Sequence, residues 1–215
     1  MSASLRITEV FLSLQGEANT VGRPTVFVRL TGCPLRCRYC DSEYAFQGGE
    51  RRSIEDLVQQ VCDFEVAYVT VTGGEPLAQP GVHELLRGLC DAGKWVSLET
   101  SGALDVSKVD ARVVKVVDFK TPGSGEVERN LWDNVAHLVA TDQVKFVLCS
   151  RADYDWARLQ CDSRGLYDKV DDVLFSPSQG QLSPTDLADW IVADRLPVRM
   201  QVQLHKLLWG DVPGR

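Results

Sequence analysis

Three of the seven cysteines lie within one short segment, with the spacing Cys33-x3-Cys37-x2-Cys40. Gly32 and Pro34 favour a loop here. Thiolates on a short loop are typical ligands of zinc or of an iron–sulfur cluster. A structural zinc site needs a closed set of four ligands, and no fourth cysteine or histidine lies near this segment in the sequence. The segment predicts a 4Fe–4S cluster on three thiolates, with one iron open to a substrate or cofactor. Three structural cysteines, or a zinc site completed by a distant ligand, are the alternatives.

A glycine-rich turn is the second candidate. Thr72-Gly73-Gly74-Glu75-Pro76 follows a run of β-branched residues that predicts a strand. Glycine lets a backbone approach a ligand closely, and carbonyl oxygens together with Glu75 can accept hydrogen bonds from an ammonium group. The two motifs together resemble those of radical S-adenosylmethionine (SAM) enzymes, and Tyr39 matches the aromatic residue usual between the last two cysteines. The resemblance implies that the amino and carboxylate groups of SAM chelate the open iron beside this turn.

A narrower resemblance runs along the whole chain. Phe11–Glu17, Gly22–Pro24 and Phe27–Cys33, together with the late segment Gln203–Lys206, resemble the 7-carboxy-7-deazaguanine synthase family of queuosine and 7-deazapurine biosynthesis. The resemblance implies a modified, compact barrel, a homodimer and a Mg²⁺-assisted radical ring contraction. The implied reaction converts 6-carboxy-5,6,7,8-tetrahydropterin to 7-carboxy-7-deazaguanine with loss of ammonia, on a 4Fe–4S cluster with SAM as cofactor.

The same resemblance assigns candidate site residues. The pterin contacts it implies are Leu14, Gln15, Gly16, Glu17, Arg29, Thr72, His205 and Arg215. The Mg²⁺ ligand it implies is Ser42, where many relatives carry threonine. The SAM contacts it implies are Tyr39, Cys40, Asp41, Gly73, Gly74, Glu75, Lys120, Thr121, Pro122, Ser176 and Gln179. In some relatives the C-terminal carboxylate also binds the pterin, and this chain continues further than theirs to Arg215.

Elementary chemistry gives each of these residues a role and an alternative. Arg29 lies among apolar strand residues, where a substrate carboxylate or an internal salt bridge would satisfy its planar fork. Gln15 and Glu17 could read the donor and acceptor edge of a pterin, or form a polar turn. Ser42 offers the oxygen donor that Mg²⁺ prefers, or caps a helix or turn. His205 is either a ligand contact or an ordinary packed or surface residue.

The remaining sequence alternates between strand-like and helix-like segments. The segments with the composition of strands are 7–13, 25–31, 67–72, 95–98, 113–119, 143–149, 173–176 and 199–204. Helical stripes fall at 53–62, 82–89, 131–138 and 154–164, with a further helix opening at Ser183-Pro184. This order predicts an α/β fold with a mostly parallel sheet, either an incomplete barrel or an open sheet, in a single domain over residues 1–215. The family resemblance implies the first, an incomplete (βα)6-type radical SAM barrel that is modified and compact. Since polar and glycine clusters follow the strands, we expect one shared site at their carboxyl ends.

Composition narrows the class of protein. The chain has 215 residues and a formal net charge of −7, which argues against a protein that wraps nucleic acid. No secretory signal and no apolar run long enough for a membrane helix is visible. An odd number of cysteines, three of them clustered, indicates a reducing compartment. We therefore expect a cytoplasmic enzyme with a small-molecule pterin substrate, without nucleic-acid or membrane partners.

Two other functions fit part of the pattern. A glycyl-radical activase also combines a compact chain with this cysteine spacing, but acts on a protein partner. A non-catalytic zinc or iron–sulfur module would need only the cysteines. The radical enzyme would also require an electron donor, for which a flavodoxin-like protein is the expectation.

Overall fold

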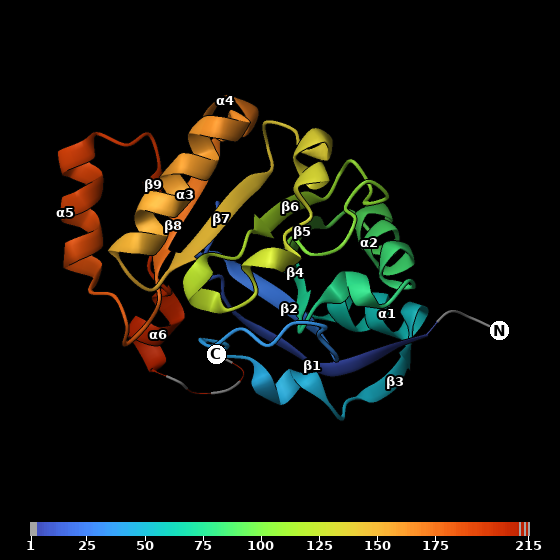
Figure 1. Ribbon diagram of the computed structural model, residues 1–215. Coiled ribbons are helices and arrows are strands. Elements are labelled where there is room, and N and C mark those ends of the chain that lie inside the picture. The colour runs from blue at the N-terminus through green and yellow to red at the C-terminus, as the bar shows by residue number, and fades with distance from the viewer. Residues whose placement is uncertain (1–3, 211, 213, 215) are drawn as a thin grey trace.

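The computed structural model describes residues 4–210, 212 and 214. These residues form one nine-stranded sheet with the strand order β3-β1-β2-β4-β5-β6-β7-β8-β9 (Figure 1). The seven mutually parallel strands are β2 (Pro24–Leu30), β4 (Tyr68–Gly73), β5 (Trp95–Thr100), β6 (Val114–Asp118), β7 (Gln143–Leu148), β8 (Asp172–Pro177) and β9 (Arg199–Met200). Strand β1 (Ser4–Leu14) runs antiparallel to β2, and β3 (Glu50–Ser53) runs antiparallel to β1. The sheet stays open between β3 and β9, which confirms the prediction of an incomplete, compact radical SAM barrel.

Helices follow most of the parallel strands. The α-helices are α1 (Ile54–Asp63), α2 (Val82–Asp91), α3 (Arg151–Arg164), α4 (Leu166–Lys169), α5 (Pro184–Asp194) and α6 (Leu204–Trp209). Short 3-10 helices are η1 (Glu43–Phe46), η2 (Pro76–Ala78), η3 (Pro122–Ser124), η4 (Val127–Arg129) and η5 (Trp132–His137). Helix α1 begins as its sequence predicts, because the Ser53 hydroxyl accepts a hydrogen bond from the Asp56 N–H at 3.1 Å.

Two predicted elements differ from the structure, and strand β3, helices α4 and α6 and the 3-10 helices η1 to η4 were missed. The stripe at 131–138 forms the 3-10 helix η5, because Asn134 is buried there and uses its amide to anchor Gly102, Leu104 and Val106. The strand expected at 199–204 ends after Met200, and the side chains of Gln201 and Gln203 donate hydrogen bonds to Glu17. Strand β3 has the polar sequence Glu-Arg-Arg-Ser, which carries no strand signal.

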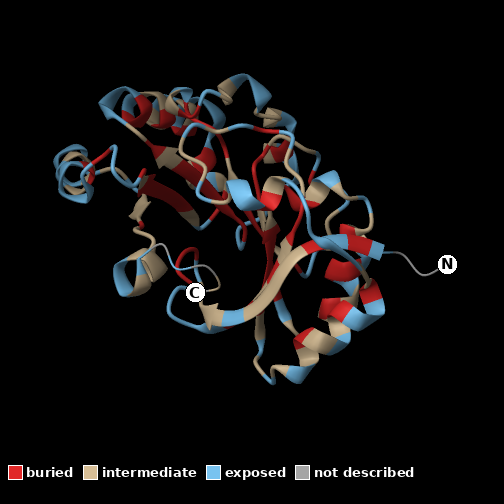
Figure 2. Ribbon diagram, turned by 90° about the horizontal axis from the view of Figure 1, so that it is seen from below, coloured by how far each residue is buried: buried red, intermediate tan, exposed pale blue. Residues whose placement is uncertain are grey.

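Two hydrophobic cores of different character lie along the sheet, one on β1, β2, β4 and β5 and the other on β6, β7 and β8. The core under α1 and α2 is aliphatic, built on residues such as Val26, Leu57 and Leu86. The core under α3, α4 and α5 is rich in aromatic rings: Phe119, Phe146, Tyr154 and Phe175 are buried, and Trp132, Trp156 and Trp190 pack against them. The three tryptophans are partly buried and therefore extend this core. Figure 2 shows the buried residues running along the strands of the sheet.

The helices in the described part of the chain are all too short or too polar to cross a membrane.

Candidate active site

A cavity of about 760 Å³ opens at the carboxyl ends of the parallel strands. Every parallel strand from β2 to β8 contributes to its wall, as expected where parallel strands end at one edge. The predicted site residues that line it are Leu14, Gln15, Glu17, Arg29, Cys33, Cys37, Tyr39, Cys40, Asp41, Ser42, Thr72, Gly73, Gly74, Lys120, Ser176, Gln179 and His205. Residues spread over almost two hundred positions of sequence thus meet in one place.

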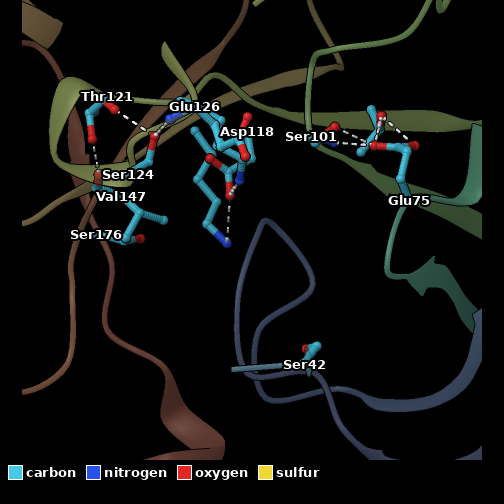
Figure 3. A network of polar contacts seen from close by, with 12 residues as sticks. Ser42, Glu75, Ser101, Asp118, Thr121, Ser124, Glu126, Val147 and Ser176 are labelled. Atoms are coloured by element: carbon cyan, nitrogen blue, oxygen red, sulfur yellow. Dashed lines mark hydrogen bonds and ion pairs between the residues drawn. The ribbon is translucent and has the colours of Figure 1, made fainter. Parts of the chain in front are cut away.

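The cysteine loop is fixed by the chain that follows β6. The Arg38 N–H donates to the Ser124 carbonyl at 3.0 Å, and the Arg36 N–H donates to the Glu126 carboxylate at 2.6 Å. Ser124 is itself held, because its hydroxyl donates to the Thr121 carbonyl and accepts from the Glu126 N–H (Figure 3). The loop is therefore held in place by backbone contacts on one side of the cavity.

The glycine-rich turn lies directly against this loop. The Gly74 N–H donates to the Leu30 carbonyl at 3.1 Å and the Glu75 N–H donates to the Gly32 carbonyl at 2.8 Å. A Cβ atom at Gly74 would clash with the Gly32 carbonyl and with the side chain of Cys33. Only glycine fits here, so the contact between the two motifs requires the residue type that the sequence provides.

The three thiols share this cavity and are not engaged in disulfides. Burial raises the pKa of the Cys37 thiol to about 11, although the Lys120 ammonium opposes the rise. Burial also raises the pKa of Cys33 and of Cys40. The thiols are therefore protonated at neutral pH, and a metal must displace their protons on binding. Across residues 4–210, 212 and 214, no three histidine, cysteine or acidic side chains are arranged to hold a metal ion.

The residues present nevertheless fit the cofactors of radical SAM enzymes. Three free thiols on one loop match a cluster with an open corner. The glycine turn beside them brings bare backbone to the cavity wall. Lys120 on the opposite side carries its ammonium 6.0 Å from the centre of the Tyr39 ring and 3.0 Å from an oxygen of Asp118. The three thiols, the backbone of the glycine turn and the Lys120–Asp118 ion pair thus lie in one cavity.

Glu17 is the one carboxylate side chain among the predicted pterin contacts, and three other side chains hold it. It forms an ion pair with Lys145 and accepts hydrogen bonds from Gln201 at 3.1 Å and from Gln203 at 2.8 Å. Burial would raise the pKa of Glu17, but Lys145 outweighs burial and holds the pKa below its ordinary value. Gln15 supports the same turn, since its amide donates to the Thr70 hydroxyl and accepts from the Glu17 N–H.

Arg29 forms the internal salt bridge that the sequence analysis gave as the alternative to a substrate carboxylate. Its Nε donates to a Glu9 oxygen at 2.7 Å, and Tyr44 donates its hydroxyl to the same oxygen at 2.8 Å. Neither Nη group of Arg29 bonds to any residue that the structure describes. The salt bridge therefore orients the guanidinium, while its fork remains at the cavity wall.

Ser42 and His205 both line the cavity, and Asp41 links their segments through hydrogen bonds with Ser42 and Gln203 and an ion pair with Lys206. The Ser42 hydroxyl donates to Asp41 at 3.0 Å and makes no cap hydrogen bond to η1, so the capping alternative is wrong. Burial would raise the pKa of Asp41, but the Lys206 ammonium and the Gln203 amide hold it below its usual range. His205 lies at the start of α6 and lines the cavity.

Four predicted contacts do not line the cavity. Glu75 is fully buried, and its carboxylate accepts from Leu77, Thr100 and Ser101 instead of facing a ligand (Figure 3). Gly16 lies under His205, where any Cβ would clash with the imidazole. Thr121 donates its hydroxyl to the Val147 carbonyl at 2.8 Å, and Pro122 opens η3. The prediction for Arg215 lies outside the described residues.

Four charged residues of the cavity are absent from the predicted contacts: Glu99, Asp118, Lys145 and Lys206. Burial raises the pKa of Glu99 to about 7, with repulsion from Glu17 as the next cause. The sequence did carry signals for them. Glu99 opens the polar cluster at the end of β5, and Lys145 is a charge inside an apolar strand, like Arg29.

The comparisons with known proteins agree with this geometry. Residues 27–116 match the family model of the Radical SAM superfamily. The crystal structure of QueE from Escherichia coli shares the fold, with a TM-score of 0.71 at 24% identity over 94% of this chain and 95% of that one. Streptococcus suis SuiB bound to S-adenosylmethionine shares it more distantly, with a TM-score of 0.58 at 14% identity over 80% of this chain and 48% of that one.

Curated relatives are more similar in sequence. The 7-carboxy-7-deazaguanine synthase of Chlorobaculum tepidum is 45% identical over 211 residues, 97% of this chain and 96% of that protein. The enzyme of the same name from Koribacter versatilis is 41% identical over 219 residues, 95% of this chain and 97% of that protein. On this full-length similarity, the chain belongs to the 7-carboxy-7-deazaguanine synthase family of the radical SAM superfamily.

Proposed function

We propose that this chain converts 6-carboxy-5,6,7,8-tetrahydropterin to 7-carboxy-7-deazaguanine with loss of ammonia. One observation carries the proposal: the cysteine loop and the predicted pterin contacts line the same cavity. A binding module would need only the cysteines. A single sheet connects both cores, which supports the proposal of one domain over residues 1–215.

Radical SAM enzymes use a 4Fe–4S cluster and SAM. One-electron cleavage of SAM to a 5′-deoxyadenosyl radical is the chemistry that a cluster on Cys33, Cys37 and Cys40 supplies. The chain's part is to orient the bound molecule. The backbone of Gly73 and Gly74 offers acceptors for an ammonium group, and Lys120, Tyr39, Ser176 and Gln179 complete this side of the cavity.

The pterin would lie toward Glu17 and Arg29. An ionised Glu17 can accept two N–H groups from the edge of a pyrimidine ring. The Nη groups of Arg29, which bond to none of the described residues, can take the carboxylate of the substrate in a bidentate pair. Glu99, with a pKa of about 7, can accept or hold a proton near neutral pH. Thr72, Gln15 and His205 supply further polar groups from the wall.

Ser42 and Asp41 offer adjacent oxygens beside the cluster loop. Mg²⁺ binds through one or two such oxygens and keeps several waters. We propose that this pair holds Mg²⁺ against the substrate carboxylate. A homodimer, a flavodoxin-like electron donor and a cytoplasmic location are further proposals that rest on the family resemblance.

The test is anaerobic turnover by protein reconstituted with iron and sulfide. With the pterin, SAM, Mg²⁺ and a reductant, we expect the absorbance of a deazaguanine and about four iron atoms per chain. Cys37→Ala should abolish SAM cleavage, whereas Cys161→Ala, a buried thiol in the aromatic core, should keep it. Reconstituted wild-type protein that cleaves SAM yet forms no deazaguanine would contradict the proposed substrate. One zinc per chain would favour the binding module.

A further inference from the structure

Lys145 is a buried cation between two parts of the cavity. It lies within β7 and is 8% exposed. Its ammonium forms an ion pair with Glu17, on the side of the predicted pterin contacts, and lies 4.0 Å from an oxygen of Asp118. Asp118 pairs more closely with Lys120 on the cofactor side. The stronger partner of Lys145 is therefore Glu17.

The other partners of Glu17 are neutral. Gln201 and Gln203 donate amide hydrogens to its two oxygens but carry no charge. Among the described residues, Lys145 is the one cation within ion-pair distance of Glu17. Glu99 and Asp41, both acidic, act on the same region of the cavity. Without Lys145, a buried carboxylate would face these acids with no compensating charge, and burial would favour its protonated form.

The protonation of Glu17 decides what it can bind. An ionised carboxylate accepts hydrogen bonds on both oxygens, whereas a protonated one must donate from one of them. The pterin edge presents N–H donors, so a protonated Glu17 would place a donor against a donor. The ammonium thus acts on the substrate through Glu17.

We propose that Lys145 is the positioning residue of the pterin site: it keeps the Glu17 carboxylate ionised and oriented as an acceptor for a ring N–H group of the substrate. This inference rests on the proposed function. It concerns the pterin side, so pterin binding should depend on Lys145 far more strongly than SAM cleavage without pterin does.

The chain provides a matched control. Lys115, on the neighbouring strand β6, is also buried and pairs with a carboxylate, Asp142, at 2.8 Å. Neither residue of that pair lines the cavity. Lys115→Met therefore breaks a buried ion pair of similar kind without touching the site, and any effect shared by both lysine variants is structural.

The experiment measures the dissociation constant of the pterin by equilibrium dialysis, using reconstituted holoenzyme with SAM and no reductant. Lys145→Met should weaken pterin binding by about 10- to 100-fold. Lys145→Arg should recover most of this loss, and Lys115→Met should change the dissociation constant by less than about twofold. Release of 5′-deoxyadenosine with dithionite and no pterin should stay within about threefold of wild type in Lys145→Met.

A double-mutant cycle keeps the inference falsifiable if Lys145→Met is poorly stable. In a Glu17→Gln background there is no carboxylate to hold, so Lys145→Met should add less than about a twofold effect. A tenfold loss in that background, an equal loss in Lys115→Met, or unchanged pterin binding in Lys145→Met would each overturn the inference. Wild-type protein that neither binds nor converts the pterin would overturn the proposed function as well.

Discussion

Buried polar and charged groups differ in their hydrogen-bond partners between the two ends of the parallel strands. At the amino end, Asp142 accepts from the Lys115 ammonium, the Lys115 N–H and the Val139 N–H, at 2.8–2.9 Å. At the carboxyl end, Asp118 keeps a buried oxygen with no hydrogen-bond partner among the described residues, as does the Tyr39 hydroxyl. Buried polar groups are nearly always paired in folded proteins. The carboxyl end therefore holds bonding capacity that the fold itself does not use.

The difference separates structural from ligand-facing polar groups better than residue type does. Glu75 lies at the carboxyl end, yet its carboxylate is saturated by protein donors. Glu99 is near it on the next strand, lines the cavity and has a raised pKa. Of these two carboxylates, Glu75 is therefore part of the scaffold, whereas Glu99 faces the cavity.

The strongest test of this contrast is Asp142→Ala. The change leaves the Lys115 ammonium buried without a partner and two backbone N–H groups unbonded. We expect the free energy of unfolding to fall by about 3–5 kcal/mol. Urea unfolding followed by circular dichroism measures it. A loss below about 1 kcal/mol would show that the amino end is not the closed network described here.

Glu75→Gln should cause the next largest loss of stability. The amide NH2 would face the backbone N–H of Leu77 or Ser101, so one donor loses its acceptor. We expect a loss of about 2–4 kcal/mol of stability, measured by the same unfolding experiment. Glu84→Gln, on the exposed face of α2, is the control and should leave stability unchanged. If Glu75→Gln unfolds like wild type but cannot bind SAM, Glu75 faces the ligand after all.

Glu99→Gln should change how stability depends on pH. The carboxyl of Glu99 has a pKa near 7 in the folded protein against an ordinary 4.5, so the folded state binds more protons between these values. The free energy of unfolding must then decrease as pH rises through this window, by about 1–3 kcal/mol. Glu99→Gln should remove this decrease. Melting temperatures at pH 5 and pH 8 for both proteins test it, and parallel curves would refute the assignment.

The smallest effect is expected away from both ends of the parallel strands. Ser53→Ala removes the hydroxyl that caps α1, while Ser53→Asp keeps an acceptor for the Asp56 N–H. The alanine variant should lose about 1 kcal/mol and the aspartate variant little. Thermal unfolding compares them. Equal loss in both would mean that the cap is not what stabilises the start of α1.

The sequence predicted most of the cavity for a simple reason. The carboxyl ends of parallel strands meet at one edge, so motifs that follow strands must lie together, as Cys33 and Gly74 do. Side-chain direction was not predictable. Nothing in Gly-Gly-Glu-Pro indicates that Glu75 turns toward Thr100 and Ser101 of the next strand, since those partners are distant in sequence.

Lys145 shows a signal that was present but not used. A lysine inside an apolar strand needs a partner for the same reason as Arg29, and only the register of the sheet reveals that its partner is Glu17. The contacts of Gln201 and Gln203 with Glu17 could not be predicted from periodicity, because the strand ends early at Met200.

The packing of His205 over Gly16 has a consequence for how the protein is made. The Leu204 N–H donates to the Gly16 carbonyl, so the turn after β1 gains its last contacts from α6. During synthesis the three cysteines leave the ribosome long before α6 exists to close the cavity over them. The nascent site is therefore open to water and oxygen at the stage when its thiols first become available, and cluster insertion could begin before the cavity is complete.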